Sequence, residues 1–121
     1  MLNIDNIELK YLNNVPFDRM VYYYNSSDVV LLTSLWEGSP NVIKEAMACN
    51  IPIVSLNIGD VNEIIKHTEG CYLAKKDPND ISIKIENALK FGKRTSGRSD
   101  IKHLSSEIIS IKITDLYKSI I

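Results

Sequence analysis

Several features that would assign the protein to a class are scarce in this sequence of 121 residues. The longest aliphatic run is Val29–Leu32, whereas a helix that crosses a bilayer needs about 20 apolar residues. Lys and Arg (14) nearly balance Asp and Glu (15), so charge gives no reason to expect nucleic acid or an anionic membrane as the main partner. We therefore expect a soluble protein without a transmembrane segment.

Cysteine is also scarce. Cys49 and Cys71 lie in apolar sequence, form no Cys-x-x-Cys pair and do not cluster with His67 or His103. A disulfide is one interpretation, but we favour buried free thiols, which are typical of cytoplasmic proteins. With so few ligands we expect no metal site. Residues 1–5 lack the basic flank and apolar stretch of a signal peptide, which also favours a cytoplasmic location.

The overall composition is that of a globular domain. Apolar residues make up 45% and charged residues 24%, which argues against disorder. A chain of this size forms one domain, and it is too short for an enzyme that needs two full nucleotide-binding domains.

Short apolar segments alternate with segments of helical periodicity along most of the chain. The expected strands are 7–12, 29–33, 51–56 and 71–74, and the expected helices are 17–26, 41–49, 61–67 and 78–91. This alternation predicts right-handed crossovers, and hence a Rossmann-like α/β domain of three layers with a small parallel sheet of about four strands. So small a sheet suggests that one or more strands are missing.

Local signals refine these boundaries. Asn50 tolerates the left-handed conformation that ends many helices, and Asp77 with Pro78 indicates an N-cap and a first helical residue. Residues 93–99 are polar, locally basic and expected to be flexible, and 100–121 have mostly helical spacing. We therefore divide the chain into an α/β body, 1–92, and a polar linker with a helical tail of the same domain, 93–121.

The loop and helix start after the most buried strand carry the candidate chemistry. Gly38 lets the backbone approach a ligand closely and adopt angles closed to other residues. Pro40 presets the first helical turn, and Ser39 can cap it. The free amides of that turn and the helix dipole favour an anion such as phosphate, at the strand end where α/β domains bind ligands.

Two carboxylates, Glu37 and Glu45, flank these amides. Glu45 lies about 7 Å along the helix axis from Pro40, a spacing that suits ribose hydroxyls beside a diphosphate. Glu37 would then face the group attached to the distal phosphate. Spacing alone leaves the ordinary alternative open, in which both glutamates are solvated and Ser39–Pro40 is only a helix start.

The wider context resembles a known family. The segment 37–49, followed by 51–55, is similar to the carboxyl-terminal half of family 4, or group 1, retaining glycosyltransferases, which carry a Glu-x7-Glu signature. Further matches are Asn25–Asp28, Val61–Glu63 and Gly70–Leu73, and the closing helices are also similar, so the resemblance covers nearly the whole chain. It implies that residues 1–92 form part of a donor-binding domain, the incomplete half of a GT-B fold.

The resemblance also implies roles for individual residues. Glu45 would bind the ribose of a nucleotide-sugar donor, and Glu37 would be the catalytic-site residue that contacts the donor sugar. The diphosphate and sugar would be lined, largely through backbone amides, by Gly38, Ser39, Pro40, Asn41 and Val42. The implied reaction transfers the glycosyl group to an acceptor hydroxyl with retention, in glycan or polysaccharide biosynthesis, without metal or other cofactor.

The chain departs from the family at its start. Only 36 residues precede Glu37. We therefore expect this chain to lack the strands that carry the family's diphosphate-binding basic residue, and to lack the N-terminal half of the enzyme. Lys44 is the nearest cation, and we expect it to be solvated. We therefore expect the isolated chain to be inactive, and to self-associate through an exposed sheet edge and apolar surface.

Two other functions stay open. The chain could be a truncated, catalytically inactive remnant or nucleotide-binding module. A nucleotide-binding regulator of flavodoxin-like topology is a third class, but it would lack the Glu-x7-Glu context.

Overall fold

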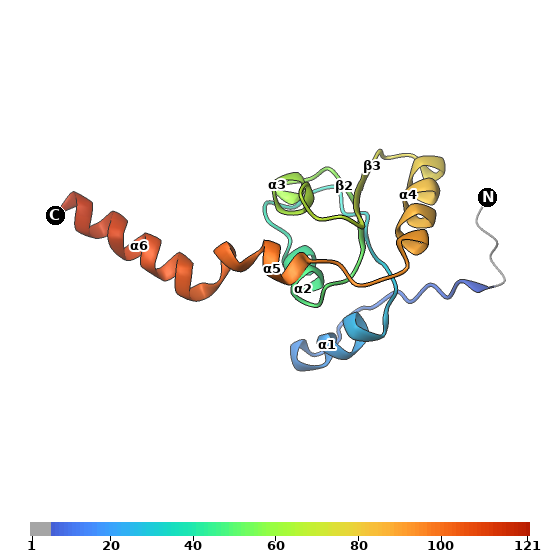
Figure 1. The fold of residues 1–121 in the computed structure, drawn as a ribbon, viewed down its shortest axis with the longest axis horizontal. Coiled ribbons are helices and arrows are strands. Elements are labelled where there is room, and N and C mark those ends of the chain that lie inside the picture. Colours follow the sequence, from blue (N-terminus) through green and yellow to red (C-terminus); the bar gives the residue numbers. More distant parts are fainter. Residues whose placement is uncertain (1–5) are drawn as a thin grey trace.

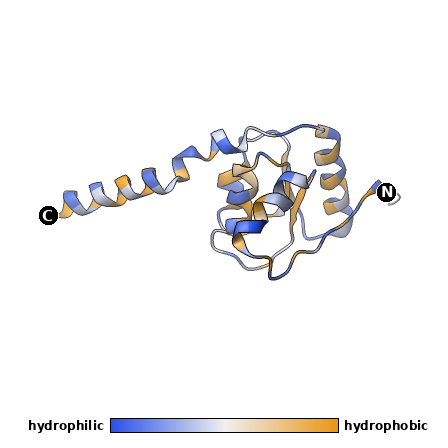
Figure 2. Cartoon of the chain, turned by 90° about the horizontal axis from the view of Figure 1, so that it is seen from below, coloured by the Kyte–Doolittle hydropathy of each residue, from blue (hydrophilic) through white to orange (hydrophobic). Residues whose placement is uncertain are grey.

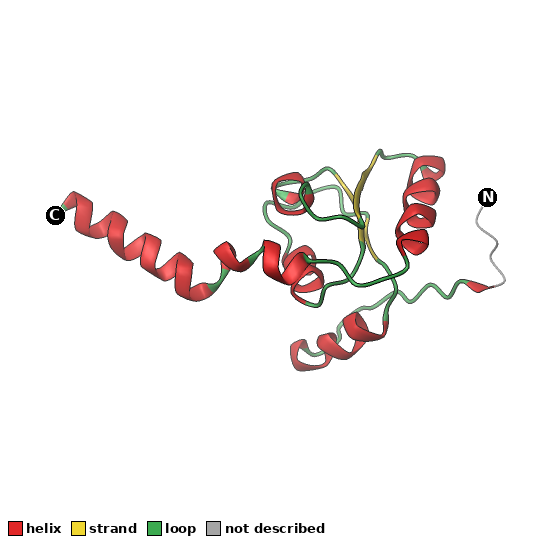
Figure 3. Ribbon diagram, in the orientation of Figure 1, coloured by secondary structure: helices red, strands yellow, loops and turns green. Residues whose placement is uncertain are grey.

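The computed structural model describes residues 6–121, and its centre is a small parallel sheet. The strands are β1 (Val30–Leu32), β2 (Ile53–Leu56) and β3 (Cys71–Ala74), in the order β1-β2-β3 (Figure 3). Val30 lies opposite Ile53, and Ile53 lies opposite Cys71. The α/β class and the small parallel sheet are thus confirmed, with three strands in the described residues.

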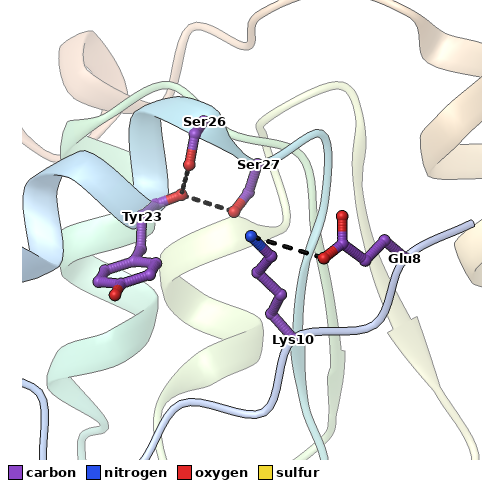
Figure 4. A network of polar contacts seen from close by, with 5 residues as sticks. All are labelled: Glu8, Lys10, Tyr23, Ser26 and Ser27. Carbon is purple, nitrogen blue, oxygen red and sulfur yellow. Dashed lines mark hydrogen bonds and ion pairs between the residues drawn. The ribbon is translucent and has the colours of Figure 1, made fainter.

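The strand expected at 7–12 does not form. In the structure this segment pairs with no strand, and Leu9 and Tyr11 are 81% and 88% exposed. Its local contact is an exposed ion pair between Lys10 and Glu8, with Nζ and Oε1 3.5 Å apart (Figure 4). The prediction was wrong because alternation only describes a half-buried strand, whereas a strand also needs a partner for its backbone groups.

Helices cover both faces of the sheet, which gives three layers (Figure 1). They are α1 (Phe17–Ser26), α2 (Asn41–Ala48) and α3 (Val61–Ile65) on one side, and α4 (Pro78–Phe91) on the other. Strand β2 is buried along its whole length because it is covered on both sides. Its Ile53 packs into the core with α2 and α3, whereas Val54 packs with Ala88 of α4.

The predicted helix boundaries are largely confirmed. Asn50 follows α2 in the left-handed conformation, with φ 58°. The side chain of Asp77 caps α4 by accepting a hydrogen bond from the Asp80 amide at 3.1 Å, and Pro78 is the first residue of that helix. Gly92 ends α4 with φ 65°. These local signals act within one turn of the helix, which is why the sequence alone reveals them.

The segment 93–99 is held in place rather than flexible. The Thr95 amide donates to the Asn50 carbonyl at 2.8 Å, and α5 (Gly97–Asp100) packs so closely on α2 that a Cβ on Gly97 would lie 2.7 Å from the Met47 carbonyl oxygen. The Asp100 carboxylate accepts from the hydroxyls of Thr68 (2.6 Å) and Ser96 (2.7 Å). These hydrogen bonds hold the pKa of Asp100 below its usual value. Polar composition misled the prediction because these contacts come from distant residues.

The helical tail is confirmed, and it leaves the body of the domain. After η2 (Lys102–Leu104), helix α6 (Ser106–Ile120) projects outward with the C-terminus at its far end (Figure 1). Apolar residues recur along it (Figure 2), and Leu116 and Ile120 are 61% and 73% exposed. Within residues 6–121, no helix is long and apolar enough to cross a membrane.

Both cysteines carry free thiols, as we predicted, but both side chains are half-buried rather than buried. Cys71 lies on β3, with its Sγ 4.0 Å from the Met47 sulfur, and burial raises the pKa of its thiol to about 11. Burial also raises the pKa of Cys49. Cys71 is therefore an unreactive, packed side chain.

Candidate functional site

The loop 33–40 leads from the carboxyl end of β1 to the start of α2. The helix begins at Asn41, as predicted, and buried Pro40 is its N-cap rather than part of its first turn. The Ile43 amide bonds to the Pro40 carbonyl at 3.2 Å, whereas the amides of Asn41 and Val42 have no hydrogen-bond partner among residues 6–121. Two free amides therefore stand at the positive end of the α2 dipole, where an anion binds favourably.

Ser39 does not cap α2, contrary to the prediction. Its hydroxyl donates instead to Asp60 Oδ2 at 2.6 Å, and the Asp60 amide donates to the Gly38 carbonyl at 3.1 Å. The other oxygen of this carboxylate, Oδ1, is buried and has no hydrogen-bond partner in the described part of the chain. Residues 38 and 39 are thus fastened to the turn that precedes α3, which fixes the loop without a capping bond.

Two glycines shape the loop in different ways. Gly59 has φ 50°, and a Cβ there would lie 2.1 Å from the Gly38 carbonyl oxygen and 2.6 Å from that of Glu37. Only glycine at position 59 lets the backbone of the turn before α3 pack directly on the backbone of the loop 33–40. Gly38 was expected to let the backbone adopt angles closed to other residues, but its φ is not positive. A Cβ on Gly38 would meet no described atom within 4 Å, so the backbone is open to a ligand.

The two candidate glutamates differ in their surroundings. Glu45 is half-buried on α2, and its Oε2 accepts a hydrogen bond of 2.7 Å from the buried Tyr24 hydroxyl of α1. Glu37 is exposed in the loop, and its side chain forms no hydrogen bond or ion pair within residues 6–121. Along the chain Glu37 precedes the free amides and Glu45 follows them, and the structure holds only Glu45 through a side-chain contact.

Most charged side chains in the segment 20–65, which contains the site, are negative. Glu37, Glu45 and Asp60 contribute carboxylates, and Lys44 is the single Lys or Arg between positions 20 and 65. Lys44 forms no ion pair with the residues that the structure describes. In the same residues, no group of three or more His, Cys, Asp and Glu side chains could hold a metal ion. The dipole and amides of α2 attract an anion to this end of the helix.

Sequence reasoning missed three residues that support the site: Tyr24, Gly59 and Asp60. Met20 and Tyr24 recur at helical spacing, which is typical of a buried helix face, and Gly59-Asp60 is typical of a turn. Neither signal pointed to Glu45 or to the loop 37–40, because each contact joins segments about 20 residues apart.

Comparison with known proteins now gives the family. The sequence profile described as glycosyl transferases group 1 matches residues 3–90, which is well over half of the chain. The chain belongs to the group 1 glycosyltransferase family. The match includes the loop 37–40, α2 and Glu45, so the candidate site lies within the part of the sequence that defines membership.

Individual relatives of this chain are glycosyltransferases as well. An uncharacterised glycosyltransferase of Methanocaldococcus jannaschii is 35% identical over 80 residues, covering 65% of this chain and 20% of its own length. An uncharacterised glycosyltransferase of Haemophilus influenzae is 32% identical over 103 residues, covering 83% and 29%. The O-antigen chain mannosyltransferase B of Escherichia coli is 32% identical over 73 residues, covering 60% and 18%. The chain thus matches less than a third of the length of each relative.

Proposed function

We propose that this chain is the donor-binding part of a retaining glycosyltransferase of GT-B architecture, which takes a nucleotide sugar as donor and an acceptor hydroxyl as nucleophile. The observation that supports it best is the arrangement around α2. Free amides of Asn41 and Val42 stand beside the open backbone of Gly38, with Glu37 before them and Glu45 after them.

Each group then has one task. The amides and dipole of α2 hold the diphosphate, and Glu45 accepts hydrogen bonds from ribose hydroxyls on the side away from the loop. Glu37 contacts the donor sugar and orients its reacting carbon. As the bond to the sugar breaks, negative charge grows on the departing diphosphate, and amides that are already in position stabilise that charge without rearrangement. No metal or other cofactor is part of this proposal.

The acidic character of the site supports a division of labour with the rest of the protein. A diphosphate needs positive side chains, yet Lys44 is the single Lys or Arg between positions 20 and 65, a segment that also carries Glu37, Glu45 and Asp60. The relatives are several times longer than the matched region, and their remaining length offers room for basic residues and an acceptor site. We therefore propose that the isolated chain binds donor weakly and transfers no sugar. The similarity to the O-antigen chain mannosyltransferase B of Escherichia coli supports a glycan or polysaccharide as the class of product.

A second candidate function is a catalytically inactive, nucleotide-binding remnant. The scarcity of positive side chains between positions 20 and 65 favours it over an independent enzyme. Both candidates predict binding through Glu45. They differ when a complementary N-terminal domain of the family is added, since a donor-binding domain then supports sugar transfer and a remnant does not.

The test is calorimetric titration of the chain with uridine and guanosine diphosphate sugars, at low salt. We expect weak binding of one of these nucleotide sugars. In Glu45→Ala its affinity should fall by at least about tenfold, because a charge-assisted hydrogen bond disappears. Glu86→Ala is the matched control, because Glu86 lies on α4 on the other face of the sheet and pairs with Lys90 at 3.3 Å. Binding that survives Glu45→Ala unchanged contradicts the ribose assignment. Transfer of a radiolabelled sugar by the purified chain contradicts its inactivity.

A further inference from the structure

A run of three tyrosines near the end of α1 has one member that turns inward. Tyr22 is 72% exposed and Tyr23 is 37% exposed, whereas Tyr24 is 5% exposed. Tyr24 is the buried residue of α1, and its ring packs in the core cluster with Ile43 and Met47 of α2. Its hydroxyl lies 2.7 Å from Glu45 Oε2, so this bond ties α1 to the middle of α2.

The chemistry of the pair fixes the direction of the bond. An ionised carboxylate only accepts, so the Tyr24 phenol must donate, and it does so only while it keeps its proton. Burial, and then the hydrogen bond to Glu45, raise the pKa of Tyr24 far above its usual value. The phenol is therefore a neutral donor at every physiological pH.

The bond leaves most of the Glu45 carboxylate available. A carboxylate offers about four acceptor positions on two oxygens, and Tyr24 occupies one of them. Within residues 6–121, no other side chain donates to either Glu45 oxygen. A vicinal diol can therefore bond to Oε1 and to the remaining position on Oε2, while the phenol keeps the carboxylate from rotating.

We infer that Tyr24 is a positioning residue for Glu45, whose hydroxyl orients the carboxylate for the two ribose hydroxyls of a nucleoside diphosphate. This inference rests on the proposed function. It goes beyond it by giving α1, which lies outside the Glu-x7-Glu segment, a part in donor recognition. A flexible glutamate would lose rotamer freedom on binding, and a glutamate held beforehand avoids that loss.

The decisive variant is Tyr24→Phe, which keeps the buried ring and removes only the hydroxyl. Tyr23→Phe is the matched control. The Tyr23 carbonyl accepts from the hydroxyls of Ser26 (3.1 Å) and Ser27 (2.6 Å), and its own phenol has no hydrogen-bond partner in the described residues (Figure 4). Each variant is titrated calorimetrically with uridine and guanosine diphosphate and with their 2′-deoxy and 3′-deoxy forms.

For the nucleotide that binds, we expect Tyr24→Phe to weaken affinity by about tenfold, the effect of one hydrogen bond to a charged group, and Tyr23→Phe to leave it unchanged. The loss should shrink for the deoxy forms, and Tyr24→Phe should add nothing in the Glu45→Ala background. A purely structural role would instead weaken all the nucleotides equally in both backgrounds.

An alkaline absorbance titration of tyrosinate tests the bond without any nucleotide. In Glu45→Ala the pKa of Tyr24 should fall relative to the wild-type chain, and an unchanged titration curve overturns the inference. Wild-type affinity in Tyr24→Phe, together with lost binding in Glu45→Ala, overturns the inference and leaves the proposed function intact. No binding by the wild-type chain, or binding insensitive to Glu45→Ala, overturns both.

Discussion

Gly59→Ala is the substitution that best tests how the loop 37–40 is held. A methyl group at this position would lie 2.1 Å from the Gly38 carbonyl oxygen and 2.6 Å from the Glu37 carbonyl oxygen. Since non-bonded heavy atoms prefer about 3.5 Å, the loop would have to move by more than about 1 Å. Both obstacles are backbone atoms, so no change of side-chain rotamer relieves the clash.

Three contributions set the expected loss of stability. The φ of 50° costs an alanine about 1 kcal/mol in the left-handed region. Moving the loop also strains the bond from the Asp60 amide to Gly38 (3.1 Å) and the bond from Ser39 to Asp60 (2.6 Å), each worth about 1 kcal/mol. We therefore expect a decrease of about 3 kcal/mol in the free energy of unfolding, a large share of the total for a small domain.

Gly92→Ala is the control that separates the cost of the left-handed backbone from the cost of the steric clash at Gly59. Gly92 has a similar φ of 65°, but its nearest neighbour would be the Lys90 carbonyl oxygen at 3.5 Å, which is ordinary contact. Its expected loss is the strain alone, about 1 kcal/mol. Urea unfolding at one pH measures both variants, and amide chemical shifts of residues 38–42 report movement of the loop. Equal losses in the two variants, or unchanged shifts in Gly59→Ala, would refute the packing argument.

Two further predictions concern Cys71 and the open surfaces. Burial raises the pKa of Cys71 from 9.0 to about 11, so the stability from keeping this thiol neutral is fully present below pH 9 and is lost as the pH rises to about 11. The urea midpoint should therefore fall more between pH 8 and 10.5 in the wild-type chain than in Cys71→Ala, and identical slopes would contradict this. In the described structure β1 pairs only with β2, and α6 exposes Ile113, Leu116 and Ile120, so light scattering should show a dimer or larger species. A monodisperse monomer at all concentrations argues against it.

Local sequence signals predicted much of the fold because their physics acts over a few residues. Asp77 caps α4 as its position before Pro78 indicated. The continuous apolar run at 29–33 was expected to be the most buried strand, but β1 is half-buried because it lies at the edge of the sheet, and the central strand β2 is the buried one. The same reasoning failed for residues 7–12 and 93–99. A strand depends on a partner strand, and the order of a polar segment depends on distant groups such as Asn50 and Thr68.

In the candidate site, too, some features follow from one continuous segment and others from the packing of distant segments. The sequence by itself placed Glu37 and Glu45 around a helix start and indicated the family, because motif spacing and helix geometry are properties of one continuous segment. Only the tertiary structure decided which groups hold that segment. Ser39 bonds to Asp60 rather than to its own helix, and Tyr24 reaches Glu45 from α1. Each of these bonds joins residues 21 positions apart, and packing of the elements around the sheet brings their atoms together.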